Sequence, residues 1–228
     1  RLRLGAPINV TTPWIHLDGL VGHLMLMDTL GKDFFITPKK LNLVPYLPSD
    51  RRALPLKRTG AIYHASASMF DYYSVRVAQI YKRFEDKWTD SLQKRKINVV
   101  AGHFKAHMMK TPYIPCREVR FYAVGDLDIV QRLLEKYLCG VGDNFRVGFG
   151  TVRDMAFEPI DEDRSIVADG VAMRAIPVEM CEEYEDATYL AYRAPYWSPR
   201  NVSLCVPPGA KCKLKDGLEG SFSPVGKD

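Results

Sequence analysis

The chain has 228 residues, of which 46% are hydrophobic and 26% charged, and a formal net charge of +5. This composition predicts a packed globular protein and excludes disordered and collagen-like chains. The longest apolar stretch, 19–27, has about half the ~20 residues that a membrane-spanning helix needs, so we expect no membrane segment. The five cysteines form no CxxC pair, so we expect neither a disulfide framework nor a zinc site, and a cytoplasmic location.

The first half of the chain predicts a strand, a helix and a long irregular region. Leu2–Val10 alternates as a first strand does, and apolar residues at three- and four-residue steps predict a helix within Ile15–Leu30. Residues 34–102 contain several prolines and many basic residues, which is typical of an insertion or a functional loop region. Inside this insertion, aromatic and aliphatic spacing predicts a helix over 69–88, followed by a strand over 97–101.

The clearest unit begins at Glu118. Residues 119–124 alternate as a strand, Asp126 is placed to cap a helix with one apolar face, a glycine-rich loop covers 139–150, and 151–157 reads as a further strand. This order is a βαβ unit, and two such units build a ferredoxin-like β-α-β-β-α-β sheet. We therefore predict an α+β, ferredoxin-like (RRM-like) single domain over 1–216 with the basic insertion, and a flexible tail over 217–228.

Charge is distributed unevenly. Residues 39–110 contain 15 basic and 5 acidic side chains, a net +10, whereas residues 153–190 contain 3 basic and 11 acidic ones, a net −8. A strongly basic segment favours nucleic acid, and an acidic one repels it, so the acidic segment should face away from nucleic acid or contact a basic protein. Solvated surface is the alternative for both segments.

The glycine-rich loop is the first candidate binding site. Its four glycines allow positive φ angles and close backbone approach to phosphate, while Arg146 can pair with phosphate and two phenylalanines can stack on bases. It is neither a Rossmann nor a P-loop motif, because a helix precedes it and no Gly-Lys-Ser/Thr follows. A helix C-cap followed by a tight turn is the alternative. The candidate residues here are Gly140, Gly142, Phe145, Arg146, Gly148, Phe149 and Gly150.

The basic region supplies the second candidate site. Cations interleaved with aromatic side chains suit a single-stranded nucleic acid, because cations hold phosphates while rings stack on bases. A merely solvated charged surface is the alternative. The candidates are Arg51, Arg52, Lys57, Arg58, Tyr63, His64 and Ser66.

Catalysis is the weaker interpretation. His16 or His64, with Tyr63 and Lys57, could act as general acid and base in metal-independent RNA cleavage. No nucleophile–base or paired-carboxylate motif accompanies them, and a structural or RNA-contacting histidine is the more common case. We therefore expect no enzymatic activity, no cofactor and no metal site.

Five segments together resemble the RAMP superfamily of CRISPR-associated proteins, most closely the "Cas five" subunit of type IV effector complexes. The resemblance spans residues 7–197. It is carried by His16-Leu17-Asp18-Gly19-Leu20, Tyr63-His64-Ala65-Ser66-Ala67, the 140–150 loop, Ala168-Asp169-Gly170-Val171-Ala172-Met173-Arg174-Ala175-Ile176-Pro177-Val178 and Arg193-Ala194-Pro195-Tyr196-Trp197.

This resemblance implies a ferredoxin-like domain whose inserted, thumb-like region grips the 5′ handle of the guide RNA (crRNA) and which caps a filament of "Cas seven"-type backbone subunits. It implies as partners the guide RNA, a large "Cas eight"-like subunit and, through the complex, target DNA, in RNA-guided defence against mobile elements. Arg146 would be the phosphate partner of the glycine loop. The RAMP loops commonly carry adjacent basic residues, whereas here Asp143-Asn144 precede a single arginine.

Three functions follow as hypotheses. The first is a non-catalytic RNA-binding subunit of a type IV complex. The second is a guide-processing endoribonuclease, as in sister RAMP families. The third is a structural adaptor that docks a partner through the acidic segment 153–190.

Overall fold

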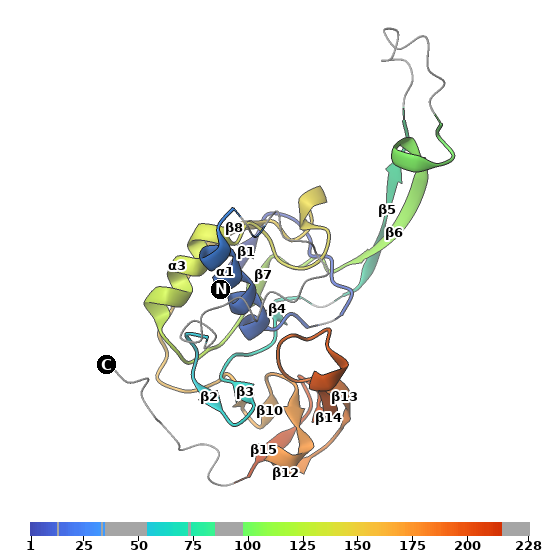
Figure 1. Ribbon diagram of the computed structural model, residues 1–228. Coiled ribbons are helices and arrows are strands. Elements are labelled where there is room, and N and C mark those ends of the chain that lie inside the picture. Colours follow the sequence, from blue (N-terminus) through green and yellow to red (C-terminus); the bar gives the residue numbers. More distant parts are fainter. Residues whose placement is uncertain (13, 33, 35–53, 73, 85–97, 216–228) are drawn as a thin grey trace.

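The computed structural model describes residues 1–12, 14–32, 34, 54–72, 74–84 and 98–215. Every strand pairing within these residues is antiparallel, and two α-helices accompany the strands, α1 (Leu17–Leu30) and α3 (Leu127–Tyr137) (Figure 1). No helix in the described part of the chain is long and apolar enough to cross a membrane. The fold is therefore a mixed α/β structure with antiparallel sheets.

The main sheet has four strands in the order β4-β7-β1-β8. These are β4 (Met69–Phe70), β7 (Glu118–Arg120), β1 (Leu2–Leu4) and β8 (Val152–Met155). In the register, Leu2 of the central strand β1 lies opposite Val119 on one side and Met155 on the other. Along the chain these elements follow the order β1, α1, β4, β7, α3, β8.

The two helices pack against the main sheet and against each other. Val21 and Leu24 of α1 and Leu133 of α3 are buried in one cluster with Leu2 and Val119 of the sheet. The Asp126 side chain caps α3, accepting a hydrogen bond from the Ile129 N–H at 3.0 Å. The helices predicted from apolar periodicity and from this cap are confirmed, as is the strand after the glycine loop.

A second group of strands surrounds a second core (Figure 1). It forms the sheets β2-β3, β9-β10, β11-β14-β13 and β12-β15. The bounds are β2 (Arg58–Thr59), β3 (Ile62–Tyr63), β9 (Val167–Ala168), β10 (Val171–Ala172), β11 (Ile176–Pro177), β12 (Cys181–Tyr184), β13 (Thr188–Ala191), β14 (Val202–Val206) and β15 (Cys212–Leu214). Ile62 of β3 is fully buried among Ile176 and Val206, so the described residues 54–68 of the predicted insertion belong to the body of the protein.

A long two-stranded arm projects from the body between β4 and β7. β5 (Arg76–Lys82) pairs with β6 (His107–Tyr113) over seven residue pairs, and the ribbon extends away from the rest of the molecule (Figure 1). The helix predicted over 69–88 is therefore wrong in its described residues, which form strands over 69–70 and 76–82 instead. The described residues 98–101 of the strand predicted over 97–101 form no strand. Two predictions fall on residues outside the described ones: the flexible tail over 217–228 and much of the insertion over 34–102.

Four short 3₁₀ helices complete the elements of the described residues. They are η5 (Gly102–Phe104), η6 (Phe145–Val147), η7 (Val178–Met180) and η8 (Pro199–Asn201). Of these, η6 forms the tip of the glycine-rich loop.

A buried ion pair joins the two groups of strands. The side chains of Asp18, on α1, and Arg174, after β10, are both fully buried, and an Arg174 Nη lies 3.3 Å from an Asp18 carboxylate oxygen. The Tyr196 hydroxyl donates to Asp18 at 2.6 Å, and Arg174 also donates to the backbone carbonyls of Tyr63, Ala65 (3.0 Å) and Tyr192 (2.7 Å). These bonds satisfy charges that would be costly to bury unpaired.

Candidate nucleic-acid interface

The glycine-rich loop after α3 has backbone φ angles, and close contacts with neighbouring backbone, that only glycine allows. Gly142 has φ +80°, and a Cβ there would collide with the Asn9 carbonyl oxygen and the Ile8 side chain. Gly150 has φ +57°, and a Cβ there would collide with the Val141 carbonyl. The glycines thus serve the packing of the loop against the 7–11 segment, and at these two positions the close approach is to the protein's own backbone.

Polar side chains anchor the loop. The Asp143 carboxylate accepts hydrogen bonds from the Thr11 N–H at 2.8 Å and hydroxyl at 2.5 Å, while the Asn144 amide donates to Asn9 at 3.0 Å. Asn9, which is 3% exposed, in turn donates to the Pro112 carbonyl at the base of β6. The acidic residue of the loop therefore faces Thr11, and the loop is fixed to the foot of the arm.

The tip of the loop presents a cation and a ring to solvent. Phe145 is 43% exposed, Arg146 is exposed, and the Arg146 guanidinium carbon lies 5.9 Å from the centre of the Phe145 ring. Phe149 is half-buried, and its ring centre lies 6.3 Å from that of Tyr113 in β6. Phosphate pairing and base stacking by these groups stay predictions, but the loop places them together beside the arm (Figure 1).

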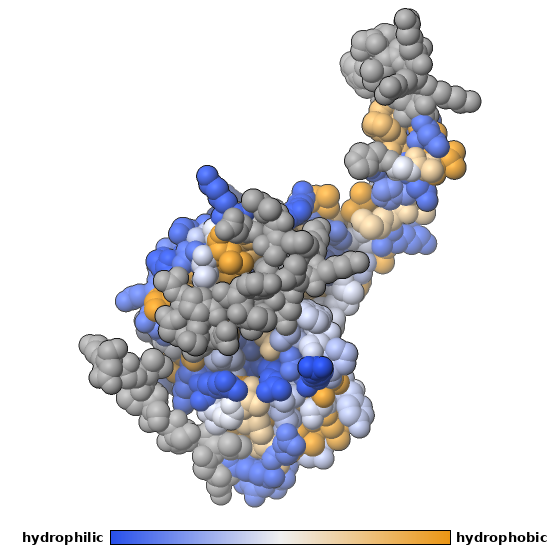
Figure 2. All heavy atoms as spheres, in the orientation of Figure 1, coloured by the Kyte–Doolittle hydropathy of each residue, from blue (hydrophilic) through white to orange (hydrophobic). Residues whose placement is uncertain are grey.

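The arm is basic and exposed. Its described residues, 74–84 and 98–113, contain no aspartate or glutamate, and all of their lysines and arginines are exposed. Side chains that lie opposite each other in an antiparallel ribbon share a face, so Tyr81, which is 67% exposed, stands next to Met108, and Gln79 stands next to Lys110. Figure 2 shows hydrophobic and hydrophilic side chains alternating along this arm. The basic residues are Arg76, Lys82, Arg83, Lys105 and Lys110.

The arm cations were not among the candidate residues chosen from the sequence. Their signal is present, since basic residues flank aromatic ones at Lys82-Arg83 and around His107. The interpretation of 69–88 as a helix concealed that these cations lie on a two-stranded ribbon.

The second predicted site does not join the first. Arg51 and Arg52 lie outside the described residues. Lys57 and Arg58 lie at the β2-β3 hairpin, on a different part of the molecule from η6 (Figure 1). Arg58 donates from Nε to the Gly60 carbonyl at 2.9 Å, and its guanidinium carbon lies 5.6 Å from the centre of the half-buried Tyr63 ring.

His64 and Ser66 are engaged inside the protein. His64 is 3% exposed, with Nε2 at 2.7 Å from the Thr59 hydroxyl and Nδ1 at 2.6 Å from the Asp163 carboxylate. Burial alone would raise the pKa of Asp163, but hydrogen bonds from His64 and Ser165 hold it well below its usual value. Ser66 is fully buried, accepting from the Tyr122 N–H and donating to the Ala67 carbonyl, each at 2.9 Å. Both side chains hold the body together.

His16, the other candidate general base, precedes α1 and stacks on Tyr196. The two ring centres are 4.0 Å apart with 4° between the planes. Burial lowers the pKa of His16 to about 4, so the ring is neutral at pH 7. Burial and the nearby Asp18 carboxylate raise the pKa of Tyr196. His16 therefore borders the buried Asp18–Arg174 pair.

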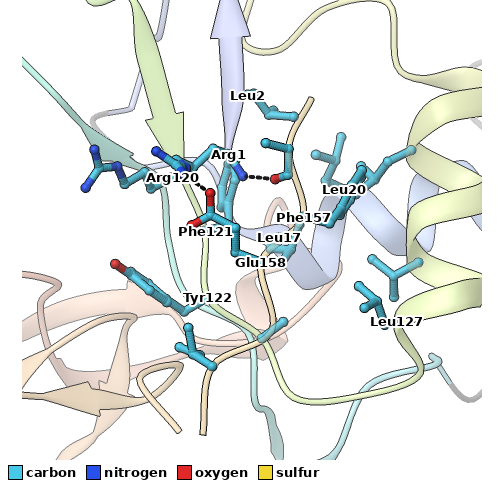
Figure 3. A pocket seen from close by; sticks show the side chains of 15 residues that line it. Arg1, Leu2, Leu17, Leu20, Arg120, Phe121, Tyr122, Leu127, Phe157 and Glu158 are labelled. Carbon is cyan, nitrogen blue, oxygen red and sulfur yellow. Dashed lines mark hydrogen bonds and ion pairs between the residues drawn. The ribbon is translucent and has the colours of Figure 1, made fainter. Parts of the chain in front are cut away.

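A cavity of about 300 Å³ lies between the two helices and the sheet (Figure 3). Leu17, Leu20, Leu127 and Phe157 give it an apolar wall, and charged groups gather at one end. These charges all have partners. The Arg1 side chain contacts Glu158, the Arg1 amino group donates to the Ala156 carbonyl at 2.7 Å, and Arg120 pairs with Glu118 at 2.5 Å. No cluster of three metal-ligating side chains occurs among the described residues.

A comparison with models of protein families finds a match. The model described as CRISPR type IV associated protein Csf3 matches residues 57–208, about two thirds of the chain. The matched segment contains the arm, the glycine loop and Arg174. No curated protein matches the chain.

Proposed function

The chain belongs to the Csf3 family of CRISPR type IV associated proteins and is thus a component of a multi-subunit complex, and from this we infer its role. We propose that it is a non-catalytic, guide-RNA-binding subunit. The observation that supports RNA binding is the basic arm with the glycine loop fixed at its foot. Cations on the arm would hold phosphates, and exposed rings such as Tyr81 and Phe145 would stack on unpaired bases.

The RAMP-like, ferredoxin-like fold is part of this proposal. The chain order β1-α1-β4-β7-α3-β8, the sheet order β4-β7-β1-β8 and the packing of both helices on the sheet support it. In this arrangement the arm is an extension between the second and third strands of the β-α-β-β-α-β unit. RRM domains read single-stranded RNA with a four-stranded sheet of this kind, whose aromatic side chains stack on bases.

The partners follow from the family and the resemblance. We propose that the bound segment is the 5′ handle of the guide RNA, that the subunit caps a filament of "Cas seven"-type subunits beside a "Cas eight"-like subunit, and that the complex targets DNA in the cytoplasm. An isolated two-stranded ribbon is only marginally stable in water. The arm would therefore gain order from contact with RNA or a neighbouring subunit.

Two contacts weigh against the ribonuclease alternative. A general base must reach the 2′-hydroxyl of the RNA. The ring of His64 is buried between Thr59 and Asp163, and the ring of His16 is stacked on Tyr196. Incubating labelled guide-repeat RNA with the purified protein in EDTA tests this: intact RNA is expected, and clean, site-specific cleavage would support the nuclease instead.

The binding experiment compares an arm variant with a matched control. Replacing Arg76 and Lys110 with Ala removes two arm cations, and replacing Lys211 and Lys215 removes two exposed cations near β15, far from the arm. For single-stranded nucleic acid each phosphate contact contributes about 0.7 to the slope of log affinity against log salt. Fluorescence anisotropy with handle RNA should show the slope reduced by about 1.4 in the arm variant and unchanged in the control. Equal slopes in both variants would contradict the proposed placement.

A further inference from the structure

A second exposed surface lies in the second group of strands, below the foot of the arm in Figure 1, at the outer face and free edge of β13. Tyr189 of β13 is 75% exposed, and Val202 of β14 is 43% exposed. The register pairs Tyr189 with Leu204 and Ala191 with Val202, so these four apolar side chains share one face of the sheet. Figure 2 shows hydrophobic side chains gathered over β13 and β14.

The edge of β13 is open in the described part of the chain. β13 is the last strand of the sheet β11-β14-β13 and pairs only with β14 among the described residues. Its sequence, Thr188-Tyr189-Leu190-Ala191, contains no charge and no proline. Proteins usually protect edge strands with charged residues, prolines or bulges, because an unprotected edge pairs readily with another chain. This edge lacks these protections.

Acidic residues precede β13 in the chain. Glu183, Glu185 and Asp186 are exposed just before β13 and make no ion pair among the described residues, whereas the neighbouring Glu182 pairs with Lys213 at 2.6 Å. The exposed Arg200 lies at the opposite end, next to β14. Negative charge at the entry to β13 repels RNA and attracts lysine and arginine.

We propose that the β13 edge is a protein-docking surface that takes an extended segment of a partner subunit by β-strand addition. The segment would carry apolar side chains at alternate positions to cover Tyr189 and Val202. It would carry lysine or arginine at the end that meets Glu183, Glu185 and Asp186. Backbone hydrogen bonds supply affinity in this mode, and side chains on one face supply specificity. The inference rests on the chain being part of a complex, as in the proposed function, but not on its RNA contact.

The test uses a photo-crosslinking residue, p-benzoyl-phenylalanine, at position 189 in the complex co-expressed with a guide array and the neighbouring subunits. We expect a crosslink to another protein that survives ribonuclease and whose crosslinked peptide contains lysine or arginine. Changing Glu183, Glu185 and Asp186 to Lys should lower the crosslink yield at least tenfold. The matched control changes three exposed carboxylates outside this surface to Lys: Glu135, Asp154 and Asp161.

Crosslinks to RNA, crosslinks to a second copy of the chain, or equal yields in the charge-reversed and control complexes would each overturn the proposal. Circular dichroism of the charge-reversed protein shows whether it is folded. Handle-RNA affinity of the protein without these substitutions separates the two proposals. A protein crosslink without RNA affinity supports the docking surface and contradicts the RNA-binding function. RNA affinity without a protein crosslink supports the RNA-binding function and contradicts the docking surface.

Discussion

Replacing Asp18 with Ala should destabilise the protein far more than replacing Asp28, although both aspartates lie on α1 and both pair with an arginine. Asp18 is fully buried, and its carboxylate accepts from Arg174 at 3.3 Å, from the Tyr196 hydroxyl at 2.6 Å and from the Gly19 N–H at 3.0 Å. Without it, the fully buried Arg174 guanidinium has no counterion among the described residues.

Breaking a buried pair by removing one partner costs about 3–5 kcal/mol, and the Tyr196 hydroxyl loses an acceptor worth about 1 kcal/mol more. A total of about 4–6 kcal/mol is a large part of the roughly 5–15 kcal/mol that stabilises a typical protein. At roughly 2–4 °C per kcal/mol for this chain length, the midpoint of thermal unfolding should fall by about 8–24 °C.

Asp28 is the control because both of its charged partners lie at the surface: Arg132 is 52% exposed and Lys136 55%. It also accepts from the Tyr137 hydroxyl at 2.6 Å. Exposed ion pairs contribute about 0–1 kcal/mol each, so Asp28→Ala should cost much less than Asp18→Ala. Urea unfolding of the purified variants, followed by circular dichroism, measures both. Equal losses in the two variants would refute the idea that the Asp18–Arg174 pair joins the two groups of strands.

Three further predictions concern His16, the glycine loop and His64. Burial lowers the pKa of His16 to about 4 from its ordinary 6.5, so between these pH values the unfolded chain binds more protons than the folded one. The free energy of unfolding should therefore rise with pH in this range, by up to about 1.4 kcal/mol per pH unit. The urea midpoint of the His16→Phe variant should lack this rise. Gly142→Ala should lower the free energy of unfolding by more than about 2 kcal/mol, because a Cβ at this position collides with backbone. Gly148→Ala should lower it by only about 1 kcal/mol, because a Cβ there meets no atom of the described residues. Similar urea midpoints for the two variants would be inconsistent with the packed loop. His64→Phe should lower the thermal midpoint yet leave handle-RNA affinity within twofold in anisotropy titrations, and a tenfold loss would return His64 to the interface.

The elements that pack against a core were predictable from the sequence. The apolar positions of α1 and α3 repeat with helical spacing because one face of each helix is buried, and Asp126 marks the start of α3. The arm was not predictable in the same way. Both faces of the ribbon meet solvent, so burial imposes no alternation, and the rings of 69–88 fit a helical spacing equally well.

The candidate site was predictable only in part. The sequence singled out the glycine loop and Arg146, but the anchoring of Asp143 to Thr11 joins residues 132 positions apart and has no local signal. His16 and His64 were considered as acid–base or RNA-contacting groups, whereas the structure places both of them, together with Tyr196, in or beside buried hydrogen-bond networks. The one sequence hint was Asp18, an acidic residue next to the apolar positions of α1, which implies a buried partner.

Mapping the contacts between this chain and the guide RNA inside the assembled complex tests RNA binding by the arm and loop most directly. Ultraviolet crosslinking followed by mass spectrometry of the crosslinked peptides identifies these contacts. We expect crosslinks within 76–82, 107–113 and 145–149. Crosslinks confined to the β2-β3 hairpin, or no crosslink from this chain while other subunits are crosslinked, would contradict it.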